Sequence, residues 1–124
     1  MKDDLKMAQD CERFFRGVVN GQFQAITSNL VTAELAWTLP KVYKFTKPDV
    51  LKALSAINTL NGLKIVDTIN LTVALSLYKN NNVKFVDCLL ISAYTDDLKI
   101  AFVSYDKDFT KLGVTRVEPS YFFN

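Results

Sequence analysis

Residues 85–109 read FVDCLLISAYTDDLKIAFVSYDKDF, and this stretch decides the predicted fold. Its first half carries apolar residues at helical spacing, namely Leu89, Leu90, Ala93 and Tyr94. They predict a helix that opens at Asp87 and packs one face inward. A continuous apolar run at residues 100–103 follows a short turn and predicts a strand over residues 100–105 that is covered on both faces.

Two carboxylates stand at the ends of these predicted elements. Asp106 follows the strand directly, and Asp87 begins the helix. Ligands bind at the carboxyl ends of the strands in parallel α/β sheets. We therefore expect Asp106 to lie in a functional position, with Asp87 as its partner across the same crevice.

The rest of the chain alternates between helices and short strands. Helices are expected after the capping residues Asp3 or Asp4, Ser28 or Asn29, Thr46, and Asp67. Pro40 is expected to kink or interrupt the second of these helices. Short strands are expected at residues 23–27, 63–66 and 115–117, with a single helical turn at residues 109–112. This alternation predicts an α/β fold with a mostly parallel sheet and helices on both of its faces.

Composition limits the possible functions. A chain of 124 residues has room for one core, so a single domain over residues 1–124 is expected. There is no histidine, which excludes Ser-His and Cys-His nucleophilic sites and most zinc sites. The net charge of +2 is too small to indicate nucleic acid or membrane by itself.

The cysteines and the apolar runs bear on location. Cys11 and Cys88 each sit in an apolar helical pattern, which favours free buried thiols over a disulfide and hence a reducing cytoplasm. No apolar run approaches the ~20 residues of a membrane span. The first ten residues also lack the apolar core of a signal peptide. We therefore expect a cytoplasmic protein that does not enter membranes.

Three segments together resemble a known family. They are TSNLVTAELAW at residues 27–37, FVDCLLISAY at 85–94 and FVSYDKDFTKLGV at 102–114. In this order and spacing they resemble a PIN domain of the VapC-type toxin group, over residues 3–117. The resemblance implies a three-layer fold with a parallel sheet flanked by helices. It also implies a small ribonuclease that depends on Mg²⁺ or Mn²⁺ held by acidic residues.

The implied site is carried over residue by residue. Glu34 matches the helical glutamate of the family, Asp87 the aspartate at a helix start, and Asp106 the aspartate after a late strand. Asp108 matches an accessory acidic position, and Ser104 falls where the family often has Thr or Ser. The resemblance thus implies that Glu34, Asp87 and Asp106 are catalytic metal ligands, with Asp108 as a further ligand.

One departure concerns the front of the chain. The family opens with an apolar strand that ends in Asp-Thr-Asn, and KDDLKMAQDCERFF at residues 2–15 resembles what normally follows it. The expected fold therefore lacks the family's first strand and its aspartate. The three remaining acids are then expected to hold metal weakly, and the chain as given is expected to have little or no ribonuclease activity.

The expected function is that of the toxin of a toxin–antitoxin pair, an endoribonuclease that cleaves RNA phosphodiesters by metal-activated water. Its partners would be RNA, an antitoxin protein and a second copy in a homodimer. The alternative is a degenerate or truncated non-catalytic PIN domain that acts as a binding or dimerisation module.

Each site residue also has an ordinary structural explanation. Glu34 could be a solvated helix charge, although Leu30, Ala33 and Trp37 indicate that its side of the helix faces inward. Asp87 could be only a helix cap, and Asp106 and Asp108 could be turn residues. The lysines at 41, 44 and 47 could bind RNA phosphates or simply be solvated surface. Residues 121–123 could pack on the domain or on a partner.

Overall fold

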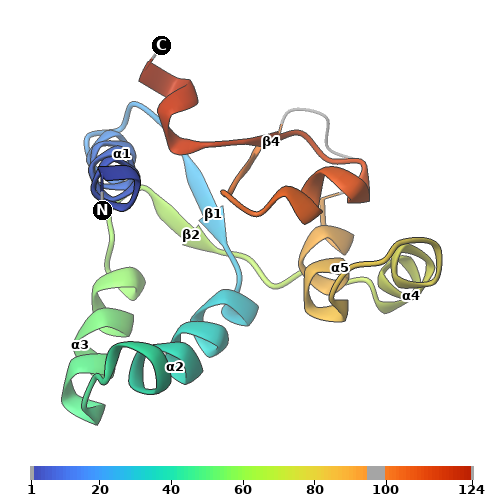
Figure 1. The fold of residues 1–124 in the computed structure, drawn as a ribbon, viewed down its shortest axis with the longest axis horizontal. Helices are drawn as coiled ribbons and strands as arrows, with labels where there is room; N and C mark the ends of the chain where they lie inside the picture. The colour runs from blue at the N-terminus through green and yellow to red at the C-terminus, as the bar shows by residue number, and fades with distance from the viewer. Residues whose placement is uncertain (1, 95–99, 124) are drawn as a thin grey trace. The chain divides into compact units, whose positions relative to one another are not determined.

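The computed structural model describes residues 2–94 and 100–123 and confirms a mixed helix and strand fold (Figure 1). Its α-helices are α1 (Lys2–Val19), α2 (Asn29–Tyr43), α3 (Lys47–Asn58), α4 (Leu71–Asn80) and α5 (Phe85–Ser92). Its strands are β1 (Ala25–Thr27), β2 (Leu63–Ile65), β3 (Phe102–Val103) and β4 (Arg116–Val117). Two 3₁₀-helices, η1 (Lys107–Leu112) and η2 (Pro119–Phe123), complete the described elements.

The strand pairs are parallel, as the alternation of elements predicts. β1 pairs with β2, where Val66 N donates to Thr27 O at 2.8 Å. β3 pairs with β4, where Phe102 N donates to Thr115 O at 2.7 Å. The described strands thus form two two-stranded sheets. A three-layer arrangement that lacks a first strand stays a prediction.

The chain divides into two compact units, described here separately. One contains residues 15–67, and the other contains residues 1–14 and 68–124. A single domain over residues 1–124 therefore also stays a prediction.

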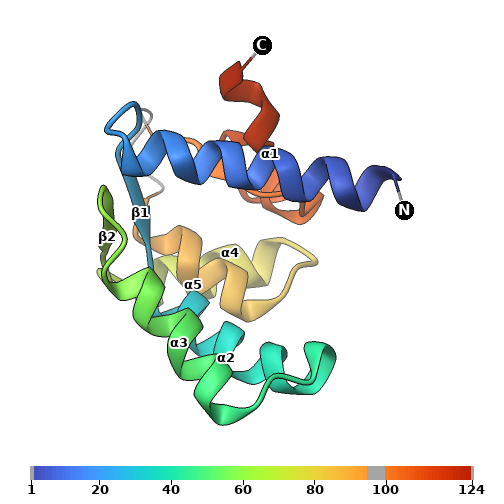
Figure 2. The same cartoon turned by 90° about the vertical axis from the view of Figure 1, so that its left-hand side faces the viewer.

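Capping residues define the helices of the unit formed by residues 15–67 (Figure 2). Ser28 caps α2 by accepting from Leu30 N at 3.1 Å. Thr46 and Asp49 form a reciprocal capping box at the start of α3, as predicted for this start. Pro40 does not interrupt α2, which continues to Tyr43. Pro40 lies within the last turn and removes only one backbone donor close to the natural helix end.

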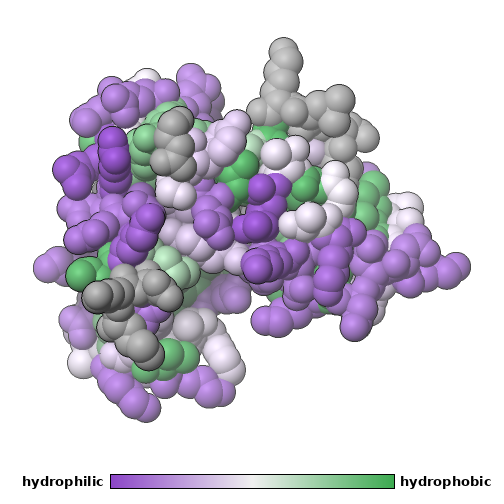
Figure 3. Space-filling view, turned by 45° about the horizontal axis from the view of Figure 1, so that its top comes forward, coloured by the Kyte–Doolittle hydropathy of each residue, from purple (hydrophilic) through white to green (hydrophobic). Residues whose placement is uncertain are grey.

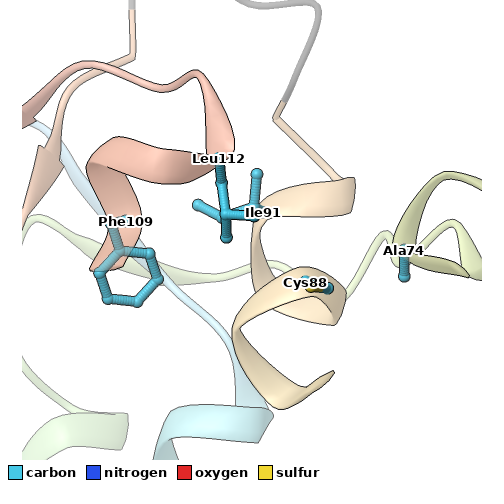
Figure 4. Close-up of a cluster of buried hydrophobic side chains, with 5 residues drawn as sticks. All are labelled: Ala74, Cys88, Ile91, Phe109 and Leu112. Carbon is cyan, nitrogen blue, oxygen red and sulfur yellow. The ribbon is translucent and has the colours of Figure 1, made fainter. Parts of the chain in front are cut away.

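The other unit has its core between α4, α5 and η1 (Figure 4). The buried side chains that contact one another there are those of Ala74, Cys88, Ile91, Phe109 and Leu112. Both cysteines are free thiols, Cys88 buried and Cys11 partly buried. The C-terminal residues pack on α1, because the rings of Phe14 and Phe122 lie 5.3 Å apart between centroids. Arg13 Cζ also lies 4.2 Å from the ring centroid of Phe123.

Element boundaries differ from the predictions at several places. The first helix begins at Lys2, so Asp3 and Asp4 lie inside α1 and neither is its cap. The helix that carries Asp87 begins at Phe85, so Asp87 lies in its first turn and is not its cap. The strand before Asp106 is only Phe102–Val103 and pairs with the equally short β4. It is partly buried and not covered on both faces, and Ala101 before it is exposed. The predicted turn before that strand falls on residues 95–99, outside the described residues. Asp67 does not cap α4, since Asn70 takes that role by accepting from Val73 N.

The surface carries large apolar side chains on several helices. Figure 3 shows hydrophobic residues exposed among hydrophilic ones on the face that it draws. The exposed ones include Leu5 on α1, Trp37 and Val42 on α2, Leu51 on α3 and Leu75 on α4. Among the described residues, none of the helices is both long enough and apolar enough to cross a membrane.

Candidate functional site

The loop after β3 holds two aspartates in a defined hydrogen-bonded turn. Asp106 N donates to Ser104 Oγ at 3.0 Å, and Asp108 N donates to Asp106 Oδ1 at 2.9 Å. The Asp106 carboxylate thereby caps η1. Arg116 Nη1 donates to Ser104 O at 2.9 Å and fixes this loop to β4. The turn and cap roles considered for Asp106 are therefore real, and they leave Asp106 exposed at the end of a parallel strand.

Asp108 differs from Asp106 in its surroundings. It is partly buried, and its Oδ1 lies 3.2 Å from Lys111 Nζ one turn later. This ion pair is between side chains that are about half exposed, so it contributes little to stability. Asp108 is thus already balanced by a cation, which suits an accessory role better than a primary one.

Asp87 lies in the first turn of α5, where the helix dipole favours a negative charge. Its residue is partly buried, and its Oδ2 atom is shielded from solvent. Cys88 follows it in the core. Burial, and then the nearby Asp87 charge, raise the pKa of the Cys88 thiol, which therefore stays protonated near neutral pH. A neutral, buried Cys88 is a packing residue and not a nucleophile.

The elements that carry these aspartates pack against each other within one unit. Cys88 and Ile91 of α5 share the core with Phe109 and Leu112 of η1. Asp87 precedes Cys88, and Asp106 and Asp108 stand at the start of η1. The core of this unit thus holds the two acidic segments on neighbouring elements, and the partnership of Asp87 with Asp106 stays a prediction.

Glu34 lies in the other unit, on the second turn of α2, and its side chain is exposed. The apolar neighbours that the sequence places on the same side of the helix do not cover Glu34. Ala33 and Trp37 are exposed, and none of the residues of α2 is fully buried. The apolar residues of α2 recur at helical spacing, but neighbouring elements do not fully bury any of them. Its convergence with Asp87 and Asp106 stays a prediction.

A polar network that sequence reasoning missed joins the carboxyl ends of β1 and β2. Asp67 accepts from Ser28 Oγ at 2.9 Å, from Asn29 N at 2.8 Å and from Asn29 Nδ2 at 2.7 Å. The backbone donor of Asn29 and the hydroxyl of Ser28 hold the pKa of Asp67 below its usual value. The signal in the sequence was that Ser28 and Asp67 each follow a strand of a parallel pair almost directly. Together they fix the start of the helix that carries Glu34.

The donor set is chemically suited to a hard divalent cation. Glu34, Asp87, Asp106 and Asp108 offer only carboxylate oxygens, the ligands that Mg²⁺ and Mn²⁺ prefer. Taken by itself, neither unit brings three or more Asp, Glu, Cys or His side chains into one metal-binding group among its described residues. The proposed ligand set draws on both units, and it remains a prediction.

Comparison with known proteins identifies the family. The family model of the PIN domain matches residues 8–114. No curated protein and no solved structure matches the chain. The PIN domain is a nuclease-type domain, and its members usually use divalent metal ions. Since the match spans most of the 124 residues, including the positions of Glu34, Asp87, Asp106 and Asp108, the chain belongs to the PIN domain family.

Proposed function

We propose that this protein is a metal-dependent endoribonuclease of the VapC type, acting as the toxin of a toxin–antitoxin pair. The family match, which covers all four acidic residues, carries this proposal. Its partners would be an RNA substrate, an antitoxin protein and a second copy of the chain in a homodimer. It would act in the cytoplasm, where free thiols such as Cys11 and Cys88 persist.

The acidic residues take separate roles in this proposal. Glu34, Asp87 and Asp106 would hold Mg²⁺ or Mn²⁺, and Asp108 would act as a further ligand or from the outer shell. When bound, such an ion supplies a nucleophile near neutral pH and neutralises charge on the leaving oxygen. Asp106 is oriented for this role by the backbone donor of Asp108, which leaves its second oxygen available. The partial burial of Asp87 excludes water from one side of its carboxylate.

The test is cleavage of a single-stranded RNA by the full chain with Mn²⁺. The exposed Glu34 is replaced by Gln, which keeps shape and removes the charge. We expect Glu34→Gln to lose at least about a hundredfold in rate, because a catalytic metal ligand is removed. Asp4→Asn is the matched control, since Asp4 is an exposed acid outside the motifs. Absence of cleavage by the parent, or equal cleavage by Glu34→Gln, would contradict the proposal.

A non-catalytic PIN domain is the second candidate. The observation that favours it is the sheet, which consists of two two-stranded pairs among the described residues. The backbone groups of Ala25 and Thr27 in β1 bond to the segment that contains β2. Backbone groups alternate in direction along a strand, so those of Ile26 point to the opposite edge of β1, where a further strand could pair. A longer protein with an added apolar strand and Asp-Thr-Asn before Met1 separates the candidates. Cleavage only by the extended protein would assign this chain to the non-catalytic class.

A further inference from the structure

The segment that forms the end of α2 and the turn into α3 has an unusual composition. Residues 37–47 read WTLPKVYKFTK, with three aromatic residues, three lysines and no acidic residue. The surrounding unit is also basic, since residues 15–67 carry six Lys or Arg against three Asp or Glu. The closest acid in sequence after this segment is Asp49, which is engaged by Thr46 in the capping box. Residues 37–47 themselves thus carry three positive charges and no negative one.

The aromatic rings of this segment are on the surface. Trp37 is 65 % exposed, Tyr43 is 64 % exposed and Phe45 is 38 % exposed. Every residue from 40 to 49 is in the exposed class. A single exposed aromatic side chain is ordinary, but several exposed within one short segment are typical of a contact site. Their concentration in one turn therefore needs an explanation beyond packing.

One of the lysines lies against a ring of this segment, and a second bonds to the same turn. Lys41 Nζ stands 3.8 Å from the centroid of the Trp37 ring, one helical turn away. Lys44 ends α2 in the left-handed conformation, with φ of 60°, and its Nζ donates to Lys41 O at 3.5 Å. This brings a second ammonium group to the same turn of the helix. The rings of Tyr43 and Phe45 lie 6.5 Å apart between centroids, at an interplanar angle of 63°.

We propose that this ring–lysine patch, formed by Trp37, Lys41, Tyr43, Lys44, Phe45 and Lys47, binds single-stranded RNA. Aromatic faces stack on unpaired bases of any sequence, and lysines neutralise the phosphates between them. Duplex RNA does not expose base faces, so a single strand is the form that the rings fit. The choice of RNA as the nucleic acid rests on the proposed ribonuclease function.

The same composition argues against a protein partner. Lysine is depleted in the buried centre of protein–protein interfaces, because its ammonium group is strongly hydrated. Here each ring has a lysine within one or four positions along the chain. Burial of the rings against a protein would therefore also bury these charges. Phosphates compensate them directly.

The test measures binding separately from cleavage. Fluorescence anisotropy of a labelled 12-nucleotide single-stranded RNA is followed with the full chain in chelator, where metal-dependent cleavage cannot occur. One variant combines Trp37→Ala, Tyr43→Ala and Phe45→Ala, and a second combines Lys41→Ala, Lys44→Ala and Lys47→Ala. The matched control combines Lys6→Ala, Lys64→Ala and Lys79→Ala, which removes three exposed lysines elsewhere.

We expect each patch variant to bind at least about tenfold more weakly than the parent, because stacking and phosphate contacts are both lost. The lysine variant should also reduce the slope of log K against log salt by about 2, the value for three single-strand phosphate contacts. The control variant should bind within about twofold of the parent at constant salt. Unchanged melting temperatures would confirm that the exposed substitutions leave the fold intact.

Three outcomes would overturn the patch. The first is an equal loss of RNA affinity in the patch and control variants. The second is unchanged RNA affinity in both patch variants. The third is a patch variant that keeps its RNA affinity and changes only the mass measured by light scattering. The last would assign this surface to contact between copies. The outcome is independent of the nuclease test, since Glu34→Gln should keep RNA binding while losing cleavage. Binding without cleavage would contradict the proposed function alone, and cleavage with a patch that does not bind would contradict the patch alone.

Discussion

Asp67 illustrates what a single residue contributes in this fold. It accepts three hydrogen bonds from Ser28 and Asn29, and these hold its pKa below its usual value. A carboxyl group with a lowered folded-state pKa contributes stability above its unfolded pKa. That contribution is lost as the pH falls through the folded value.

We therefore predict that Asp67→Asn lowers the melting temperature at pH 7 and flattens its decline in acid. The curves of parent and variant should approach each other as the pH falls through the lowered folded-state pKa of Asp67, where its carboxylate is protonated. Thermal unfolding followed by circular dichroism from pH 7 to pH 2.5 measures this, with Asp4→Asn as the control. A constant difference between the curves at all pH values would show that Asp67 does not act through its charge.

Substitution of Asp87 tests whether the three acidic residues of the proposed site form a cluster. If Glu34, Asp87 and Asp106 converge, Asp87→Asn relieves their repulsion and removes a shielded charge. The variant should melt higher than the parent in chelator and lose the stabilisation that Mn²⁺ gives the parent. Differential scanning fluorimetry with and without Mn²⁺ measures both effects. A variant that melts lower in chelator and still responds to Mn²⁺ would contradict the assignment of Asp87.

Residue roles were predictable from sequence where they are local. Ser28 and Thr46 cap their helices as predicted, because a cap is fixed by residues two or three positions away. Asp67 was assigned to the following helix for the same reason. It instead bonds residues nearly forty positions earlier, because β1 and β2 pair in parallel and bring their ends together. No local pattern contains that pairing.

At the scale of elements, α5 and η1 hold the acidic segments through a small core. Ile91 is fully buried in it, together with Cys88, Phe109 and Leu112. Truncation of such a side chain removes contacts and leaves a cavity. The stability of this unit should therefore depend steeply on the size of residue 91.

We predict that Ile91→Val costs about 1 kcal/mol in the free energy of unfolding and Ile91→Ala about 2–5 kcal/mol. Urea unfolding at constant m-value measures the series. Leu75→Ala is the control, since Leu75 on α4 is 53 % exposed and should cost much less. Equal losses at residues 75 and 91 would show that the described core is not the one that stabilises the unit.

Elements were predicted in the correct order, and their lengths were less accurate. The apolar run at residues 100–103 suggested a strand of six residues, whereas β3 spans two. An apolar run reports burial and not hydrogen bonding, and strand length is set by the partner strand. The length of α2 was underestimated instead, because Pro40 was expected to kink or interrupt it. Pro40 lies in the last turn of α2, so the helix continues past it to Tyr43.

At the scale of the whole molecule, exposed apolar side chains predict self-association. α1 exposes Leu5, Phe15 and Val19, although the residues that follow Pro119 cover part of this helix through Phe14. Exposed large apolar side chains of this kind are typical of contact sites between proteins. Multi-angle light scattering should give the mass of a homodimer at micromolar concentrations. A constant monomer mass across the series would count against this prediction.

The family was predictable from sequence because its three segments keep their order and spacing, and the match to residues 8–114 confirms it. The joint site was less accessible to sequence reasoning. Asp87 and Asp106 lie on elements that pack together through neighbouring core residues, and this follows from their apolar context. Glu34 belongs to another compact unit, and no periodicity within either unit relates it to the two aspartates.

Gly62, at the start of β2, has a consequence for how variation in this protein should be interpreted. Its φ of 86° disfavours side chains, and a Cβ there would stand 2.4 Å from Val18 O. Asn61 Nδ2 donates to Val19 O at 2.9 Å and holds the turn in that position. In a scan of all single substitutions, every substitution at position 62 should abolish function, and the same pattern is expected of a catalytic residue. Variants of Gly62 should fail to fold and be degraded in the cell, whereas variants of Glu34 should accumulate as folded but inactive protein. The cellular level of each variant protein would therefore distinguish a residue needed for folding from one needed for catalysis.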